Sequence, residues 1–396
     1  MNARRRRAIY HYRKALRTLA EEPGLYPLRL FTVMFPLYRV SVRGQGRRAE
    51  DFEELEWFIA RAIGHAQVNS VVALSDFYGL DEQLTRYIVE VLKSIGHLTE
   101  GDDGRLAFTR LGRESLADGR RYEIYESHQI LYFDAFTCHP LPRPHYRLSF
   151  RTPGELHDKD RALYSFEPWR PETLNDPAWR REQAEYNVPD EVEVLEPLDI
   201  GSAYLPMHIV AAMHRDGTPA LRVFTNVRGR RDAFFKDLLT ERPEIVASLL
   251  DDQRAPQEVI AMGLENRDLY KGSYRLDRAP GGEWRMTVPE RWLGGRRADG
   301  VERLAELGEY ILAADYCVRV WSDDGDLRYR AACDQILDRL EHIPRELATA
   351  EVQEHVDDVF TGLDVSVAEV TILLKMARTQ GLGRAMERLE NLIDEG

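Results

Sequence analysis

Between residues 51 and 119, apolar positions recur every three or four residues, which is typical of helices that bury one face. This spacing predicts three consecutive helices, over 51–64, 71–79 and 81–96. Asp81 is suited to begin the third helix, because its carboxylate can accept hydrogen bonds from the free N–H groups of the first turn. Leu84, Ile88, Val91, Leu92 and Ile95 are expected to form the buried face of the third helix, which ends at Gly96.

A hairpin and a fourth helix are predicted to follow. The short apolar runs 97–99 and 105–108 flank a turn composed of Gly101, Asp102, Asp103 and Gly104. Such a turn between two apolar runs favours a β-hairpin. The helical spacing then returns over 109–116.

The order of helices, hairpin and final helix resembles the winged helix-turn-helix superfamily of bacterial DNA-binding domains. The resemblance covers residues of about 51–119 only, under a fifth of the chain. It is carried by Val72-Ala73-Leu74-Ser75, Leu84-Thr85-Arg86, residues 92–98, and residues 108–116, in which Thr-x-x-Gly-Arg is followed by a leucine three residues later.

The resemblance implies that the third helix enters the major groove of DNA while the hairpin, or wing, touches phosphate. Carried over to this chain, the expected DNA contacts on the third helix are Gln83, Thr85, Arg86 and Lys93. Near the wing they are Arg105, Arg110 and Arg113.

Outside residues 51–119, the pattern predicts a mixture of strands and helices. Helices are expected over 4–22, 232–239, 244–250, 301–312, 329–340, 350–360 and 365–392. Strands are expected over 26–42, 122–136 and 316–321, with Gly44 and Gly46 in a loop, and hairpins over 204–226 and 274–288. Residues 140–197, rich in proline and tryptophan, are interpreted as a structured connection with short elements.

The predicted fold class is therefore α+β, with a winged helix-turn-helix module followed by a mixed β-rich domain and a mainly helical C-terminal region. We expect a basic N-terminal helix and strand over 1–48, the winged helix over 49–119, the aromatic connection over 120–196, an α+β domain over 197–300 and a helical domain over 301–396.

Charge is distributed unevenly along the chain, whose net value is −13. The first 48 residues hold twelve Lys and Arg against two acids, so they carry +10 and the remainder carries −23. Such a basic arm is expected to follow a phosphate backbone or enter a minor groove. The residues expected to do so are Arg4, Arg5, Arg6, Arg7, Arg13, Lys14 and Arg17. A solubilising terminus, or pairing with the chain's own acids, stays open as an alternative.

The predicted winged helix is itself acidic. Residues 51–118 contain thirteen acids and six bases, a net charge of −7. Because neutralisation of phosphate supplies most DNA affinity, this charge leaves two hypotheses open. The first is a non-enzymatic DNA-binding protein, a regulator or genome-defence component. The second is a protein-interaction subunit of a larger bacterial complex, with the winged helix as a protein-contact module.

Local motifs for catalysis are not visible, and we propose no catalytic residue, metal site or cofactor. Arg228, Arg230 and Arg231 precede a predicted helix, where their guanidinium groups and the helix N-terminus favour phosphate. A hydrolase or nuclease within residues 120–300 stays an open alternative, since catalytic carboxylates need no local signature.

The remaining expectations concern location and partners. No apolar run reaches the roughly 18 residues of a membrane span, and the first residues, MNARRRR, lack the apolar segment of a signal peptide. The three separated cysteines suit a reducing cytoplasm. Apolar stripes on the C-terminal helices indicate core packing, with a protein partner or homo-oligomer as the alternative.

Overall fold

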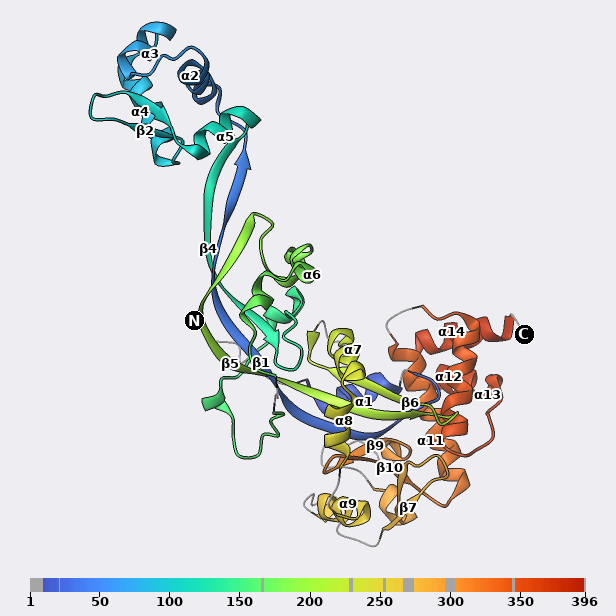
Figure 1. The fold of residues 1–396 in the computed structure, drawn as a ribbon. Coiled ribbons are helices and arrows are strands. Elements are labelled where there is room, and N and C mark those ends of the chain that lie inside the picture. The colour runs from blue at the N-terminus through green and yellow to red at the C-terminus, as the bar shows by residue number, and fades with distance from the viewer. Residues whose placement is uncertain are drawn as a thin grey trace. The chain divides into compact units, whose positions relative to one another are not determined.

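The computed structural model describes residues 10–20, 22–164, 167–227, 231–251, 254–265, 274–295, 303–343 and 346–394. Helices and strands both contribute substantially, so the α+β class is confirmed. The chain divides into two compact units, each built from several segments (Figure 1). Unit 1 comprises Met1–Phe35, Arg147–Leu163 and Tyr204–Gly396, and unit 2 comprises Pro36–Tyr146 and Tyr164–Ala203.

Strand β1 (Leu25–Glu50) is longer than predicted and contributes to both units. The expected loop at Gly44 and Gly46 is wrong, because the strand continues through both glycines. A Cβ atom on Gly46 would lie 1.7 Å from the carbonyl oxygen of Glu191, and one on Gly44 would lie 2.7 Å from Ser127 Oγ. These glycines therefore permit close approach to neighbouring chain rather than a turn.

In unit 2, the second half of β1 pairs antiparallel with β4 (Arg121–Asp134), in a register running from Leu37 opposite Asp134 to Glu50 opposite Arg121. Between these two strands the chain forms the helical module, residues 51–119. Its elements are α2 (Glu54–His65), α3 (Val71–Tyr78), α4 (Glu82–Ser94), β2 (Leu98–Glu100), β3 (Leu106–Phe108) and α5 (Arg110–Asp118). Their order and approximate bounds confirm the predicted helices and hairpin.

One face of the β1–β4 pair is covered by the segment that was expected to be a structured connection. Its short elements within unit 2 are η1 (Arg143–Arg147), η3 (Pro171–Asn175), α6 (Pro177–Arg180) and η4 (Gln183–Tyr186), while η2 (Pro153–Glu155) belongs to unit 1. Leu174, Trp179 and Val188 share a buried cluster with Leu131 and Phe133 of β4. This cluster is the main core of unit 2 outside the helical module.

Unit 1 combines strands with the remaining helices. Its strands, besides the first half of β1, are β5 (Val192–His214, which begins in unit 2), β6 (Pro219–Phe224), β7 (Arg275–Arg278), β8 (Trp284–Thr287), β9 (Tyr310–Ala313) and β10 (Tyr316–Trp321). Its helices are α1 (Tyr12–Ala20), α7 (Ala233–Glu241), α8 (Pro243–Leu250), α9 (Pro256–Glu265), α10 (Glu290–Leu293), η7 (Arg303–Glu306), α11 (Gly325–His342), α12 (Thr349–Gly362), α13 (Val370–Gln380) and α14 (Gly383–Asp394). The sheet order is β6-β5-β1-β10-β8-β7, and β9 pairs with β10.

Two expected helices are wrong in this unit. In place of the helix expected over 301–312, the described residues from 303 onward form the short turn η7 and then β9, because Gly308 has a φ of +85° that ends the helical path. The expected helix over 365–392 is two helices, separated where Gly381 adopts a φ of +71°. The expected helix over 4–22 begins at Tyr12 within the described residues, and residues 4–9 lie outside them.

The apolar stripes of the C-terminal helices lie in the core of unit 1. Ile336, Leu337 and Leu340 of α11 are fully buried, and Leu373 of α13 is buried beside them. This arrangement accounts for the stripes through packing within the chain. In the part of the chain that the structure describes, no helix is both long and apolar enough to cross a membrane.

Candidate functional site

The helical module owes its element boundaries to local capping. Ser70 Oγ accepts a hydrogen bond from Ala73 N at the start of α3, and Thr109 Oγ1 accepts one from Gly112 N at the start of α5. Asp81 accepts from two backbone N–H groups at the start of α4, as predicted. Each such cap satisfies donors that the first turn would otherwise leave free. The sequence therefore fixes where these three helices begin.

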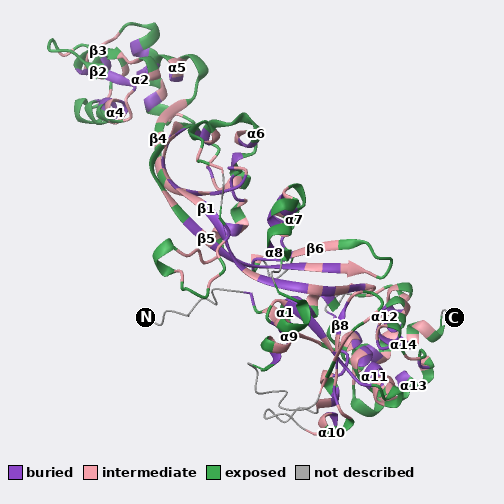
Figure 2. Ribbon diagram, turned by 60° about the horizontal axis from the view of Figure 1, so that its bottom comes forward, coloured by how far each residue is buried: buried purple, intermediate pink, exposed green. Residues whose placement is uncertain are grey.

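The core of the module is small and is formed by the inward faces of its helices. Ile59, Leu74, Val89 and Leu92 are fully buried, and Leu106 of the hairpin is nearly so. In Figure 2 much of α4 and of the neighbouring helices is coloured as exposed. Helix α4 thus has one buried face and one broad face open to solvent.

Thr85 does not belong to the open face of α4. It is fully buried, and its Oγ1 donates to Asp81 O over 3.1 Å. The expectation that Thr85 is exposed to DNA is therefore wrong. Thr85 lies three residues before Ile88, which is also buried, so it shares the inward stripe of the helix.

Most of the expected cationic contacts of the module are occupied by its own carboxylates. The pairs are Arg86 with Glu82 at 2.9 Å, Lys93 with Glu90 at 2.8 Å and Glu100 at 2.7 Å, Arg105 with Asp103 at 3.6 Å, and Arg110 with Glu114 at 2.9 Å. The hydrogen bonds to Glu100 and Glu90 raise the pKa of Lys93. These four bases are therefore locally neutralised.

The other two bases of the module have different roles. Arg113 Nη1 donates to the carbonyl oxygen of Phe108 over 2.9 Å, which fixes it against the hairpin. Arg61 lies over the ring of Trp57, with its Cζ atom 5.9 Å from the ring centroid. Gln83 is exposed near the start of α4, as predicted. The open face of α4 thus carries few cations that are free to meet phosphate.

Large apolar side chains occupy the surface instead. On α4, Tyr87 is 67% exposed, while Phe77 on α3 is 57% exposed. Leu84 is 40% exposed, so its expected place on the buried face of α4 is wrong: the inward stripe begins at Thr85. The exposed members on the three helices are Leu55, Phe58, Val72, Phe77, Leu84 and Tyr87, which we call the apolar surface of the module. Six large apolar side chains therefore remain exposed on the three helices.

Part of this surface is held together by aromatic contacts. The ring centroids of Phe77 and Tyr78 are 4.9 Å apart, and those of Phe58 and Tyr78 are 6.2 Å apart. Tyr78 Oη also donates to the carbonyl oxygen of Phe58 over 2.8 Å. Tyr78 therefore links α2 to α3, and it holds the two exposed phenylalanines in a fixed arrangement.

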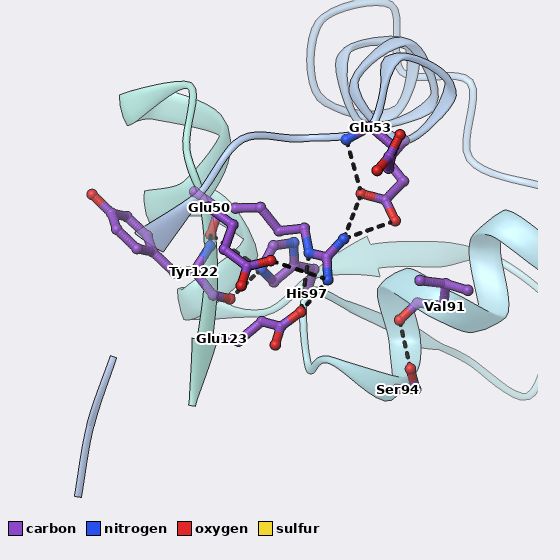
Figure 3. A network of polar contacts seen from close by, with 10 residues as sticks. Glu50, Glu53, Val91, Ser94, His97, Tyr122 and Glu123 are labelled. Carbon is purple, nitrogen blue, oxygen red and sulfur yellow. Dashed lines mark hydrogen bonds and ion pairs between the residues drawn. The ribbon is translucent and has the colours of Figure 1, made fainter. Parts of the chain in front are cut away.

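A buried polar network lies at the base of the module, where α5 leads into β4 (Figure 3). His97 Nε2 lies 2.7 Å from the carbonyl oxygen of Tyr122 and 3.1 Å from Ser115 Oγ. Burial, and secondarily the charge of Arg121, lowers the pKa of His97. The neutral ring with its proton on Nε2 fits this position, because that proton can be donated to the carbonyl oxygen of Tyr122.

Arg121 extends the network to α2 and along β4. Its guanidinium is paired with Glu123 and with Glu56, the latter over 3.2 Å, and it lies 3.9 Å from Glu50. The hydrogen bond with Glu123 raises the pKa of Arg121. This network ties the module to the β1–β4 pair. The sequence did not single out these residues, since their meeting depends on contacts between distant segments.

The basic arm is only partly described. Arg4, Arg5, Arg6 and Arg7 lie outside the described residues. Arg13, Lys14 and Arg17 are exposed on α1, in unit 1. A hydrogen bond with Tyr12 raises the pKa of Arg13, with a further contribution from Glu306 and Glu309. The three described cations of the arm are thus accessible, and acids of unit 1 lie within electrostatic range of Arg13 and Arg17.

The other cations among the first 48 residues are matched by acids from distant parts of the chain. On β1, Arg39 lies 3.9 Å from Asp199, Arg47 lies 2.8 Å from Glu114 and 3.1 Å from Glu193, and Arg48 lies 4.0 Å from Glu191, while Arg43 is also paired with Glu196. Arg29 is buried, 4.0 Å from Asp315. Much of the positive excess is therefore compensated within the chain.

The expected phosphate site before α7 is described only at Arg231. Arg228 and Arg230 lie outside the described residues. Arg231 is paired with Glu22 over 2.7 Å, and the same carboxylate binds Arg222 over 2.7 Å. Asp232 caps α7 by accepting from Phe235 N over 3.2 Å. The guanidinium of Arg231 and the N–H of Phe235, which could have bound phosphate, therefore already have carboxylate partners.

Within the described ranges, no three His, Cys, Asp or Glu side chains gather as a metal ion would require. Comparison with known proteins does not extend this description. The chain matches no protein-family model, no curated protein and no solved structure.

Proposed function

We propose that this chain is a subunit of a protein complex, and that its helical module is a winged helix that binds a protein partner. The observation that carries the proposal is the open face of α4, which presents Tyr87 and Leu84 where a DNA-reading helix would present free polar and basic side chains. Aromatic side chains on an otherwise exposed helix are typical of interaction hot spots.

Electrostatics supports a protein partner over a polyanion. The module carries a net charge of −7, and four of its six bases are paired with its own carboxylates. To bind phosphate, these pairs would have to open, and the remaining acids would still repel the ligand. A protein surface with apolar side chains and a basic border has neither disadvantage.

The partner's chemistry follows from the positions of the acids around the apolar surface. Asp76 is exposed on α3 beside Phe77, and Glu54 is exposed on α2 beside Leu55. An apolar centre bordered by carboxylates fits a partner that inserts apolar side chains and places Lys or Arg at the rim. Polar rim pairs of this kind direct association more than they add affinity.

The proposal is tested by placing a photoreactive amino acid at position 87 in the cell that produces the protein. We expect one partner to be crosslinked in stoichiometric amount. The purified complex should then lose at least about tenfold in affinity on Tyr87→Ala, since a buried hot-spot aromatic contributes more than about 1.4 kcal/mol. The matched control is Arg110→Ala on α5, where the side chain is 89% exposed, and its affinity should be unchanged. Absence of a crosslinked partner, or equal affinity of Tyr87→Ala and wild type, contradicts the proposal.

DNA binding is a second candidate, favoured by the exposed cations Arg13, Lys14 and Arg17 on α1. It is tested by measuring affinity for a DNA duplex against salt concentration. If those cations contact phosphate, replacing all three by alanine should lower the salt slope by about 2.7. No binding at low salt by the full chain rejects this candidate.

A further inference from the structure

Strand β4 has two edges, and the parity of its residues decides which backbone groups face each edge. In an antiparallel pair, both backbone groups of alternate residues face the same neighbour. Ala135, just beyond the strand, donates its N–H to Pro36 O at the β1 side over 3.2 Å. The odd-numbered residues therefore direct their backbone groups toward β1, and the even-numbered residues direct theirs away from it.

The N-terminal end of the outer edge is closed by the helical module. Tyr122 N donates to Ser115 Oγ over 3.2 Å, and Tyr122 O accepts from His97 Nε2 over 2.7 Å. Both outward groups of this even-numbered residue are thus satisfied. The polar network of Figure 3 covers the first position of the edge.

The C-terminal end of the edge is closed by the segment that follows β4. Tyr132 N donates to Tyr146 Oη over 3.1 Å, and Tyr132 O accepts from Leu141 N over 2.8 Å. Asp134 similarly exchanges hydrogen bonds with Cys138 and His139. At both ends, the even-numbered residues therefore direct their backbone groups away from β1, as the hydrogen bond of Ala135 predicts.

Between these ends lies an open stretch formed by Ile124, Glu126, His128 and Ile130. Within the described part of unit 2, β4 pairs with β1 alone, and no described residue donates to or accepts from the outward N–H and C=O groups of these four residues. Ile124 is 67% exposed, and Glu126 and His128 are exposed as well. Figure 1 shows β4 beside β1 in the ribbon that leads to the helical module. Open edges of this kind are templates for another strand.

We propose that the open edge of β4 pairs with the same edge of a second copy of this chain, antiparallel and centred on Ser127. A two-fold axis at Ser127 places Ile124 opposite Ile130 of the second copy and Glu126 opposite its His128. Each apolar residue then meets an apolar residue, and each carboxylate meets an imidazole. The stretch is self-complementary in this register, which is the property an isologous dimer requires.

The backbone is satisfied by the same register. None of the four residues is proline, so each copy offers four N–H and four C=O groups. Pairing of even-numbered with even-numbered residues makes these positions hydrogen-bonded pairs, and it places Ser127 opposite its copy in a non-hydrogen-bonded pair. All eight open groups of each copy then find partners. A shift by one residue along the strand would place even-numbered residues of one copy opposite odd-numbered residues of the other. The backbone groups of the odd-numbered residues face β1, so these hydrogen bonds could not form.

The side chains of the four residues share one face of the sheet, where cross-strand neighbours interact directly. Pairs of β-branched side chains, and a carboxylate opposite an imidazole that can donate a hydrogen bond to it, stabilise strand pairing in such positions. The short length of the edge predicts a modest, concentration-dependent dimer rather than an obligate one. This inference is independent of the partner proposed for the helical module, since it uses a different surface.

The test is sedimentation velocity of the full chain over a wide range of concentration. We expect a monomer–dimer equilibrium. His128→Glu sets Glu126 against a glutamate of the second copy and should weaken the dimer by about tenfold, combining two lost pairs with two repulsive ones. The double variant Glu126→His with His128→Glu restores opposite partners in the same register, and it should recover the affinity of the wild type.

A matched control separates this pairing from a general effect of charge. Ile130→Lys removes an apolar pair and should abolish the dimer, whereas Gln83→Lys adds the same charge on the helical module and should leave it intact. The proposal is overturned if the wild type stays monomeric at every concentration. It is also overturned if the double variant is as weak as His128→Glu, because the register would then be different. Dimerisation that is lost in Gln83→Lys would place the interface on the module instead.

Discussion

The helical module and the C-terminal helices of unit 1 are built from the same amphipathic spacing, but they use their apolar residues differently. In α11, Ile336, Leu337 and Leu340 are fully buried. In α4, Tyr87 and Leu84 remain exposed although the same helix buries Ile88 and Leu92. The difference indicates that the outer apolar residues of the module exceed what its own core requires. They are available to a partner, and their removal should cost the fold little.

The largest effect is expected on the buried side of this comparison. Phe360 of α12 is fully buried and contacts Tyr329 with ring centroids 5.8 Å apart. Phe360→Ala should destabilise unit 1 by about 3–5 kcal/mol, through lost burial and the cavity left behind. Hydrogen exchange of peptides from α11 to α14 measures this loss. Retained protection in these peptides would contradict the assignment of Phe360 to the core.

A smaller effect is expected where local capping defines the module. Asp81→Ala removes the acceptor for Gln83 N and Leu84 N, so it should destabilise α4 by about 1 kcal/mol. Exchange of the amides of residues 82–86 reports this change. Asp81→Asn retains a capping oxygen and is the control, and a loss equal to that of alanine would argue against a capping role.

The buried histidine at the base of the module should make its stability depend on pH. Because the pKa of His97 is lowered in the folded protein, the unfolded chain binds protons more readily than the folded one. The stability that His97 contributes is therefore present above the unfolded pKa of about 6.5 and is lost as the pH falls below it. Hydrogen exchange of residues 95–118 from neutral to mildly acidic pH measures this loss.

His97→Gln sharpens that measurement, since its amide can donate to the carbonyl oxygen of Tyr122 without titrating. The pH dependence of residues 95–118 should become flatter in this variant. The control is His65→Gln, because His65 is exposed at the end of α2. An equal change in both variants would mean that the pH dependence arises elsewhere.

The smallest effect is expected on the open side of the comparison. Tyr87→Ala should change the stability of the isolated chain by less than about 0.5 kcal/mol, as is usual for exposed positions. Thermal unfolding checks this value. A loss of several kcal/mol would show that Tyr87 supports the fold, and the comparison with α11 would no longer hold.

Local features of the sequence were enough to predict the module and its limits. Ser70, Asp81 and Thr109 cap the helices that follow them, and Gly79 ends α3 in the left-handed conformation. These signals act within a few residues, so a single sequence contains them completely. The winged-helix identity and its ligand stay predictions, because no match to a known protein tests them.

Features that depend on distant segments could not be predicted in the same way. Gly44 and Gly46 resemble loop glycines until the backbone of Glu191 is placed beside them. The basic residues of β1 resemble a free cationic arm until Glu114, Glu193 and Asp199 are brought within reach. Thr85 is the exception, because its spacing from Ile88 already indicates the buried stripe. Long-range pairing, rather than local preference, decided the first two cases.

The chain passes from one unit to the other within strands as well as within loops. The boundary at Phe35 and Pro36 falls inside β1, and the boundary at Ala203 and Tyr204 falls inside β5. A gene fragment ending at either boundary would encode an incomplete strand. The unpaired N–H and C=O groups left on its neighbours would promote aggregation. Separate expression of the units is therefore an unsuitable way to divide this protein. Excision of residues 51–119, between two paired strands, is the cleaner dissection.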